Sequence, residues 1–343
     1  MATRPPPTPT LSGSPADARQ LERALELAER GRGTTRPNPI VGAVVVADGE
    51  VAGEGWHERK GLPHAEVIAL ERAGQRARGA TLYVTLEPCA HHGATPPCAD
   101  AVIAAGVARV VAAAGDPNPT THGRGFERLR TAGIEVVLLG GELEWRARVQ
   151  NEGYRTWVAS GRPFVTYKAA VTLDGKVAAA GGDARWVSGE ESRRRVHELR
   201  AGADAVAVGM GTVRAENPLL TAREVGAERQ PRRLAFGEGP LPEGSELELR
   251  SGPLAEELAA LASEGVQSLL LEGGPTLAAA FLRAGLIDKL LLFVAPKLAG
   301  GAGAPSLFAG AAAERMADTI GVVRLTSVPV GEDLLVTAYI HEP

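Results

Sequence analysis

The chain has 343 residues, of which 44% are hydrophobic, 23% charged and only 4% aromatic, and its formal net charge is −4 at pH 7. This length predicts two domains of a globular protein. The negative charge and the few aromatic residues argue against a nucleic-acid-binding surface, and no apolar run reaches the roughly 18 residues that a membrane helix needs.

The N-terminal segment and the cysteines bear on location. Residues 1–15 are rich in proline, threonine and serine, which predicts a disordered tail rather than a secretory signal. The chain contains 2 cysteines, too few for a disulfide framework. Because thiols stay reduced in the cytoplasm, we expect the protein to be cytoplasmic.

The first part of the chain predicts an α/β domain. An amphipathic helix is expected at 17–30, and Asp48-Gly49 is typical of a hairpin turn after a strand at 40–46. Helices and strands then alternate, at 64–77, 80–86, 98–105, 107–114, 126–132 and 134–139. This order predicts a three-layer α/β domain over 16–150, with mainly parallel later strands.

A more polar stretch, 151–161, marks the predicted domain boundary, and a second domain is expected over 160–343. Its predicted strands are 163–170, 203–209, 232–236, 266–274, 289–296 and 333–340, and its predicted helices are 190–200, 253–263 and 276–284. This alternation predicts a second α/β domain with its own core.

A candidate zinc site combines His64, Cys89 and Cys98. One imidazole and two thiolates suit tetrahedral zinc with the fourth position open for water, as a catalytic zinc requires. Glu66 stands two residues after His64, so its carboxylate can face the bound water without binding the metal. There it can move a proton from the water to the leaving ammonia. The pattern is the H-x-E…P-C-x-x-C signature of nucleobase deaminases, except that eight residues separate the cysteines.

Alternatives remain open at this point. The thiols could be unrelated buried groups, or the zinc could be structural, with His91 or His92 as a fourth ligand. The first domain could also be a non-catalytic, zinc-stabilised binding module, in which Glu66 would have no task. A nucleic-acid deaminase is a further alternative, against which the net charge of −4 argues.

Several segments, in order, resemble the bifunctional riboflavin-biosynthesis deaminase/reductase family. They are TTRPNPIVGAVVV, GLPHAEVIAL, YVTLEPCAHHGATPPC, AGVARVVAAAGDPNP, YKAAVTLDGKVA and LLLEGGPTLAAAFL. The resemblance implies a cytidine-deaminase-like domain followed by a dihydrofolate-reductase-like domain. It implies zinc-dependent deamination of 2,5-diamino-6-ribosylamino-4(3H)-pyrimidinone 5′-phosphate, NADPH-dependent reduction of the ribosyl chain to ribityl, and a homo-oligomer joined through the reductase domains.

The resemblance also implies binding residues. Those of the deaminase pocket would be Asn38, His57, His91, Asp116 and Asn118. Those that contact NADPH would be Ala170, Trp186, Thr212, Glu216, Gly274, Pro275, Thr276, Leu277, Ala278, Ala279 and Ala280. Those near the reductase substrate would be Lys168, Asp174, Arg200, Leu220, Arg223 and Glu272. From the residues alone, Asn38 and Asp116, which each precede a proline, could instead cap turns, and Arg200 could lie on a solvated helix face.

The chain departs from the family pattern in three places. Ala94 stands where the family usually has a basic residue for the substrate phosphate. Gly237 and Glu238 replace an Asp-Ser pair near the cofactor, and the shortened segment 241–251 is expected to replace at least one strand–helix unit. The alternative that follows is an active deaminase beside a weakened or inactive reductase.

Overall fold

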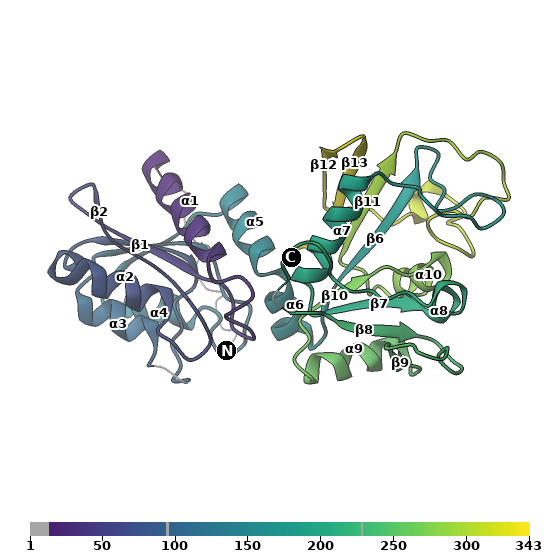
Figure 1. The fold of residues 1–343 in the computed structure, drawn as a ribbon. Coiled ribbons are helices and arrows are strands. Elements are labelled where there is room, and N and C mark those ends of the chain that lie inside the picture. The colour runs from purple at the N-terminus through teal and green to yellow at the C-terminus, as the bar shows by residue number, and fades with distance from the viewer. Residues whose placement is uncertain (1–13, 94–95, 228) are drawn as a thin grey trace, which may run out of the picture. The chain divides into compact units, whose positions relative to one another are not determined.

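The computed structural model describes residues 14–93, 96–227 and 229–343, and the chain forms two compact units (Figure 1). The first unit ends at Ser160 and also includes Pro343, and the second extends from Gly161 to Glu342. Within the described ranges, no helix combines the length and the apolar character needed to cross a membrane. Most of the predicted tail lies outside the described residues, but its last two residues, Ser14 and Pro15, are the N-cap and the first residue of a helix.

The first unit is a sheet with helices on both faces. Its strands are β1 (Gly42–Ala47), β2 (Glu50–Trp56), β3 (Thr81–Leu86), β4 (Arg109–Ala114) and β5 (Glu135–Leu138). Its helices are α1 (Pro15–Glu29), α2 (Ala65–Ala73), the 3-10 helix η1 (Gly74–Ala77), α3 (Cys98–Ala105), α4 (Arg124–Thr131), α5 (Gly141–Gln150) and α6 (Glu152–Ser160). In the order β2-β1-β3-β4-β5, β1 is antiparallel to both neighbours and the last three strands are parallel. The predicted α/β fold of this domain is confirmed.

Glycines shape the β1–β2 hairpin and the packing of α2 on it. Asp48 and Gly49 have φ angles of 52° and 80°, and positive φ at both positions is what a type I′ turn requires. A Cβ added at Gly53 would lie 2.2 Å from the carbonyl oxygen of Ala69. Because Gly53 leaves this space empty, the backbone of α2 packs directly on β2.

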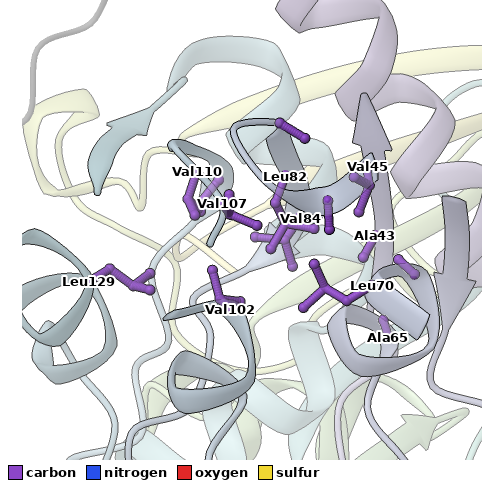
Figure 2. Close-up of a cluster of buried hydrophobic side chains, with 14 of the residues drawn as sticks. Ala43, Val45, Ala65, Leu70, Leu82, Val84, Val102, Val107, Val110 and Leu129 are labelled. Carbon is purple, nitrogen blue, oxygen red and sulfur yellow. The ribbon is translucent and has the colours of Figure 1, made fainter. Parts of the chain in front are cut away.

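Alternate side chains of the strands fill two cores. Val84 and Val110 pack with α2, α3 and α4 (Figure 2), whereas Tyr83 and Val111 pack with α1 and α5. Full burial of one such valine stabilises the fold by about 1.5–3 kcal/mol. The strands therefore hold α2 and α3, whose first residues approach the candidate zinc site, on the same face of the sheet.

The stretch 151–161, expected to be a polar boundary, is largely helix α6, which belongs to the first unit. Asn151, just before this helix, is buried. Its Oδ1 accepts a hydrogen bond from the N–H of Ile40 at 2.8 Å, and its Nδ2 donates to the carbonyl oxygen of Ile40 at 2.9 Å. The polar side chain therefore fastens α6 to the segment before β1.

The second unit is also a sheet between helices. Its strands are β6 (Phe164–Thr172), β7 (Ala205–Gly209), β8 (Arg232–Phe236), β9 (Glu248–Arg250), β10 (Ser268–Leu271), β11 (Lys289–Ala295), β12 (Arg324–Val330) and β13 (Asp333–Tyr339). Its helices are α7 (Glu190–Gly202), α8 (Met210–Glu216), α9 (Leu254–Ser263), α10 (Pro275–Arg283) and the 3-10 helix η2 (Met316–Asp318). The order is β12-β13-β11-β6-β10-β7-β8-β9, parallel from β11 to β9 and antiparallel at β13. The expectation of a second α/β domain is confirmed.

A loop without a helix, residues 237–247, connects the parallel neighbours β8 and β9, and the structure describes every residue of it. Parallel strands are usually joined through a helix that covers the sheet. Here Leu241 and Leu247 of the loop pack with Val206 and Met210 instead. The shortened segment thus keeps a short strand, β9, and loop side chains cover the sheet face.

Candidate functional site

Three side chains that suit zinc meet at the N-terminal ends of α2 and α3. His64 is the N-cap residue of α2, Cys98 is the first residue of α3, and Cys89 lies between β3 and α3. The Nδ1 atom of His64 is 3.0 Å from the Sγ of Cys98 and 3.8 Å from the Sγ of Cys89. All three potential ligand atoms lie within 4.8 Å of one another. Both cysteines are free, so their sulfurs are available to a metal.

These residues fit a catalytic zinc ion. One nitrogen and two sulfurs leave a fourth tetrahedral position for a further ligand. Glu66, in the first turn of α2, is 3% exposed, and its Oε2 makes no hydrogen bond to any atom of the described residues. Such a buried oxygen is costly unless a bound group pairs with it. A hydrogen bond with the Cys98 thiol is the main cause that lowers the pKa of Cys89, which favours the thiolate that zinc binds.

The electrostatic environment of Glu66 suits proton transfer. Burial raises the pKa of its carboxyl to about 7. A proton acceptor works best when its pKa is near the working pH. Glu66 can therefore take up a proton and release it near neutral pH.

Asn38 and His57 adjoin this cluster. The Nδ2 of Asn38 lies 3.1 Å from the Nε2 of His57, and the Nδ1 of His57 lies 3.2 Å from the carbonyl oxygen of Pro63. Burial lowers the pKa of His57. The two predicted pocket residues are thus in contact with each other, and His57 also contacts Pro63, the residue that precedes His64.

The loop between β4 and α4 carries Asp116 and Asn118. The Oδ1 of Asp116 accepts hydrogen bonds from the N–H of Asn118 at 2.9 Å and from the hydroxyl of Tyr154 at 3.2 Å. The Nδ1 of His91 lies 3.3 Å from the Oγ1 of Thr121 in the same loop. Asp116 therefore shapes a turn, as one alternative expected, and the loop contacts the segment that follows Cys89. Ala94 lies outside the described residues.

Glu87 holds this loop in place, and the sequence reasoning missed it. The side chain follows strand β3, is 4% exposed, and accepts hydrogen bonds only from backbone groups among the described residues. The donors are the N–H groups of Asp116 at 3.3 Å, Gly123 at 3.0 Å, Gly125 at 3.0 Å and Phe126 at 3.3 Å. The sequence did contain a signal for this role, an acid directly after the strand TLYVTL. A carboxylate at the end of a buried strand is itself buried, and a buried carboxylate needs hydrogen-bond partners.

The second unit contains a cleft of about 1060 Å³. Its lining includes parts of β6, β7 and the segment after β10, so it lies where clefts of parallel sheets bind ligands, at the carboxyl ends of the strands. The predicted residues that line it are Lys168, Ala170, Trp186, Arg200, Thr212, Glu216, Leu220, Arg223, Glu272, Gly274 and Pro275.

A charged cluster occupies the cleft wall. The guanidinium of Arg200 donates to both carboxylate oxygens of Glu272, at 2.6 and 3.0 Å, and the Nζ of Lys168 lies 3.8 Å from the same carboxylate. Burial opposes the charge of Glu272, but Lys168 and Arg200 more than offset this and keep its pKa below the ordinary value. Burial lowers the pKa of Lys168. The cluster presents two cations and one anion to a ligand.

Other predicted residues lie elsewhere. Asp174 is exposed and accepts hydrogen bonds from the N–H groups of Ala299 at 3.1 Å and Gly300 at 2.8 Å, so it fastens one loop to another. The remaining predicted cofactor residues, which continue from the cleft along α10, are Thr276, Leu277, Ala278, Ala279 and Ala280. Ala278 and Ala279 are buried in the core.

Gly237 and Glu238 begin the loop after β8. Glu238 is exposed, and its carbonyl oxygen accepts a hydrogen bond from Arg214 at 2.6 Å. Within the described residues, neither belongs to the lining of the cleft.

Helix α7 contributes further cleft residues that were not predicted. Arg193 and His197 line the cleft together with Arg200. Their spacing of four and three residues places them on one face of the helix. This periodicity of basic residues was a usable signal in the sequence.

Comparison with known families agrees with the two sites. Residues 15–114 match the model of the cytidine and deoxycytidylate deaminase zinc-binding region. Residues 163–241 and 246–333 match the model of the RibD C-terminal domain. The fold, the candidate zinc site and these matches define a bifunctional enzyme with a zinc-binding deaminase domain and a reductase domain.

Individual proteins are similar along most of the chain. The riboflavin biosynthesis protein RibD of Aquifex aeolicus is 44% identical over 316 residues, which covers 83% of this chain and 88% of that protein. The RibD of Escherichia coli is 42% identical over 328 residues, covering 83% and 89%. Among solved structures, Acinetobacter baumannii RibD matches with a TM-score of 0.82 at 37% identity, over 94% of this chain and 98% of that one.

A further solved structure is the diaminohydroxyphosphoribosylaminopyrimidine deaminase/5-amino-6-(5-phosphoribosylamino)uracil reductase of Thermotoga maritima. It matches with a TM-score of 0.79 at 36% identity, over 94% of this chain and 98% of that one. The chain belongs to the RibD family of riboflavin biosynthesis proteins.

Proposed function

We propose that this chain deaminates 2,5-diamino-6-ribosylamino-4(3H)-pyrimidinone 5′-phosphate with zinc and then reduces the ribosyl chain to ribityl with NADPH. The observation that carries the first step is the convergence of His64, Cys89 and Cys98 beside the buried carboxylate of Glu66. The substrate class is supported by the name of the Thermotoga maritima relative, a deaminase and reductase of ribosylaminopyrimidines.

In the deaminase domain, His64, Cys89 and Cys98 would hold the metal. A bound zinc ion would supply the Lewis acidity that activates water for attack on the amine-bearing carbon. Glu66 takes the proton from that water and delivers it to the departing amine. Its buried Oε2, without a partner among the described residues, is free to accept this proton.

In the reductase domain, the cleft would take the ribosyl chain and the cofactor. Arg200 and Lys168 attract the anionic substrate, and Glu272 between them accepts hydrogen bonds from ribosyl hydroxyls. Gly274 and Pro275, at the N-terminal end of α10, line the cleft, so this helix N-terminus would offer a phosphate site for the cofactor. NADPH would supply the hydride for the imine carbon.

The test is to give the zinc-loaded protein the freshly made substrate with and without NADPH, and to identify the products by mass spectrometry. We expect replacement of the amino group by oxygen without NADPH and a further gain of two hydrogens with it. Deamination that stops there with both NADPH and NADH would refute the reductase half, and no deamination would refute the zinc-dependent half.

We also propose that the protein forms a cytoplasmic homo-oligomer through the reductase domain. Strand β12 is an edge of its sheet, and it exposes Leu325 by 63% and Val328 by 53%. Ile320 and Val323, just before it, are also exposed by more than half. An apolar edge strand is a typical site of association. A second copy of the chain suits it, because the strand can pair with its own equivalent.

Light scattering tests this assembly. The double variant Leu325→Lys/Val328→Lys is expected to have the monomer mass at micromolar concentration. Val51→Lys, at an exposed position of strand β2 in the other domain, is the matched control and should keep the wild-type mass. A wild-type protein that is already monomeric would overturn the assembly.

A further inference from the structure

A buried carboxylate, that of Asp333, lies against the first turn of helix α7. Asp333 is the first residue of strand β13 and is 4% exposed. Its Oδ2 accepts a hydrogen bond from the N–H of Gly189 at 2.7 Å and another from the hydroxyl of Ser192 at 2.5 Å. Gly189 is the N-cap residue of α7, and a glycine has no side chain that could cap the helix. A carboxylate from a distant strand therefore caps α7.

Two further observations make this cap a firm contact. Ser192 is completely buried, so its hydroxyl would lose a hydrogen bond away from water if the carboxylate were removed, which is costly. Gly331, in the turn before β13, has a φ angle of 59°, and a Cβ added there would lie 2.7 Å from the Oε2 of Glu191. The turn between β12 and β13 thus packs closely on the first turn of α7, next to Asp333.

Helix α7 has one row of side chains toward the sheet and a neighbouring row toward the cleft. Ser192 and Val196 are buried, and Val196 packs with residues of β11 and β13, beside which α7 lies (Figure 1). Arg193 and His197, each one residue further along the helix, line the cleft. Because both rows belong to one rigid helix, the contact that fixes Ser192 also fixes the position of Arg193.

Arg193 forms a stacked pair with Trp186 on the wall of the cleft. The guanidinium carbon of Arg193 lies 4.6 Å from the centroid of the Trp186 ring, and its Nη1 donates a hydrogen bond to the carbonyl oxygen of Ser188 at 2.9 Å. Trp186 is 65% exposed and lines the cleft. An indole and a guanidinium side by side suit a ligand with flat rings and phosphate groups. The nicotinamide cofactor of the proposed reduction is such a ligand.

We propose that Asp333 is a positioning residue of the reductase, which caps α7 and thereby holds Arg193 and Trp186 in the arrangement that binds the cofactor. This inference rests on the proposed reduction. The last turn of α7 is held in a different way, by the two hydrogen bonds from Arg200 to Glu272. Loss of the cap therefore affects binding of the cofactor more than binding of the ribosyl substrate.

The cap can be tested without cofactor and without turnover. Hydrogen exchange of the full-length protein, measured by mass spectrometry, reports on the backbone amides in the first turn of α7. We expect these amides to exchange about tenfold faster in Asp333→Ala, the effect of one lost charge-assisted hydrogen bond. Asp333→Asn should keep part of the protection, because its amide oxygen can still accept both hydrogen bonds. Unchanged exchange in Asp333→Ala would overturn the inference.

Cofactor binding and kinetics test the positioning role. We expect Asp333→Ala to raise the Kd of NADPH, measured by the fluorescence of the cofactor, and its KM by about threefold to tenfold. The KM of the deaminated intermediate, supplied directly, and the kcat of reduction should change less, and Asp333→Asn should recover most of the loss. If Asp333 acts through Arg193, the double variant Asp333→Ala/Arg193→Ala will match Arg193→Ala alone. Additive losses in the double variant would contradict this route.

Asp288 provides the matched control, because it is a buried carboxylate of the same domain. It is 2% exposed, precedes β11 and accepts hydrogen bonds from Arg162 at 2.6 Å and from the N–H of Val165 at 2.7 Å. Among the described residues it is not part of the cleft lining. Asp288→Ala should also lower the free energy of unfolding, but it should leave the Kd of NADPH unchanged. An equal rise in this Kd for Asp288→Ala and Asp333→Ala would show a general loss of stability and overturn the positioning role.

The remaining outcomes are also decisive. If Asp333→Ala does not fold, Ser192→Ala removes one of the two hydrogen bonds and should give the same changes at a smaller scale, and wild-type exchange and NADPH affinity in Ser192→Ala would then overturn the inference. A wild-type protein that neither binds NADPH nor reduces the intermediate would refute the proposed reduction. Hydrogen exchange would still decide in that case whether Asp333 caps α7.

Discussion

The backbone N–H of Gly125 donates a hydrogen bond of 3.0 Å to the carboxylate of Glu87, and it thereby links the end of strand β3 to the loop that carries Asp116 and Asn118. The same carboxylate receives the N–H of Gly123 at 3.0 Å. Since Cys89 stands two residues after Glu87, a single buried side chain fixes both the metal-binding segment and the loop beside it.

Glu87→Gln should weaken this link. The amide nitrogen of glutamine would face backbone N–H groups, so donors would meet a donor and charge-assisted hydrogen bonds would be lost. We expect the free energy of unfolding of the deaminase domain to fall by about 2–4 kcal/mol, measured by denaturant titration. Glu127→Gln, at an exposed position of α4, is the control and should stay within about 0.5 kcal/mol of the wild type. Equal stability of the two variants would contradict the role of Glu87.

Gly125→Ala should displace the same loop by a different route. An added Cβ would lie 1.9 Å from the carbonyl oxygen of Pro88, so the loop and the segment before Cys89 must move apart. We expect a loss of about 1–3 kcal/mol in stability, typical of overpacking, together with impaired deamination. Gly93→Ala is the matched control, because its Cβ would meet no described atom within 4 Å. A Gly125→Ala protein that melts and deaminates like the Gly93→Ala protein would rule out the close approach.

The zinc ligands and the proton carrier should respond differently to substitution. Cys89→Ser is expected to lose bound zinc, which metal analysis of the purified protein will show. Glu66→Gln should keep zinc and lose deamination by about 10²–10⁴-fold, the usual contribution of a general base. Full zinc in Cys89→Ser, or normal turnover in Glu66→Gln, would contradict the assignment of that residue.

Arg200 tests the reductase cleft. Arg200→Lys keeps the charge but loses the two-pronged contact with Glu272 at 2.6 and 3.0 Å, and lysine does not replace arginine well at such sites. We expect a rise of about tenfold or more in the KM of reduction, with deamination unchanged. Arg195→Lys on the same helix, where Arg195 pairs with Glu198 at the surface, is the control. Similar kinetics for both variants would contradict the assignment of Arg200 to the substrate site.

Asp17 should govern stability in acid. Burial alone would raise the pKa of Asp17, but hydrogen bonds from Arg109, the Ser14 backbone and Tyr83 more than offset this, and the pKa is below its ordinary value. Because the folded pKa is below the unfolded value of about 3.9, the stabilisation is complete above that pH and is lost as the pH falls toward the folded pKa. Asp17→Asn should be less stable by about 1–3 kcal/mol at pH 7, and the difference should shrink below about pH 4. A difference that does not change with pH would refute this account.

Buried elements of the fold could be predicted from the sequence, whereas exposed ones could not. Strands such as Thr81–Leu86, which is buried except at its first residue, are rich in apolar and β-branched residues and were predicted. Strand β12 was not, because its residues are exposed and include Pro329, so no alternation marks it. Helix α6 was not predicted, since the contact of Asn151 with Ile40 beside it spans 111 residues and no local pattern reveals it.

The site was predictable where spacing carries the chemistry. His64, Glu66, Cys89 and Cys98 could be grouped from the sequence, because zinc limits the ligand types and the positions that can combine. The acid at the end of strand β3 marked Glu87 as unusual, but its partners could not be predicted, because they are backbone groups that only the folded loop brings together. Asp174 looked like a cleft residue by resemblance, yet its carboxylate binds the backbone of Ala299 and Gly300.

The helix-free connection from β8 to β9 has a practical consequence. Leu241 and Leu247 cover the sheet, and the exposed turn between them makes no such contact. This turn can therefore vary in length at a low cost in stability, because loop-closure entropy grows slowly with loop length. The match to the RibD C-terminal model is interrupted between residues 241 and 246, at this turn. This turn is therefore a suitable place to insert an affinity tag or a fluorescent reporter. Measured deaminase and reductase activities of the tagged protein would then show that both domains still fold.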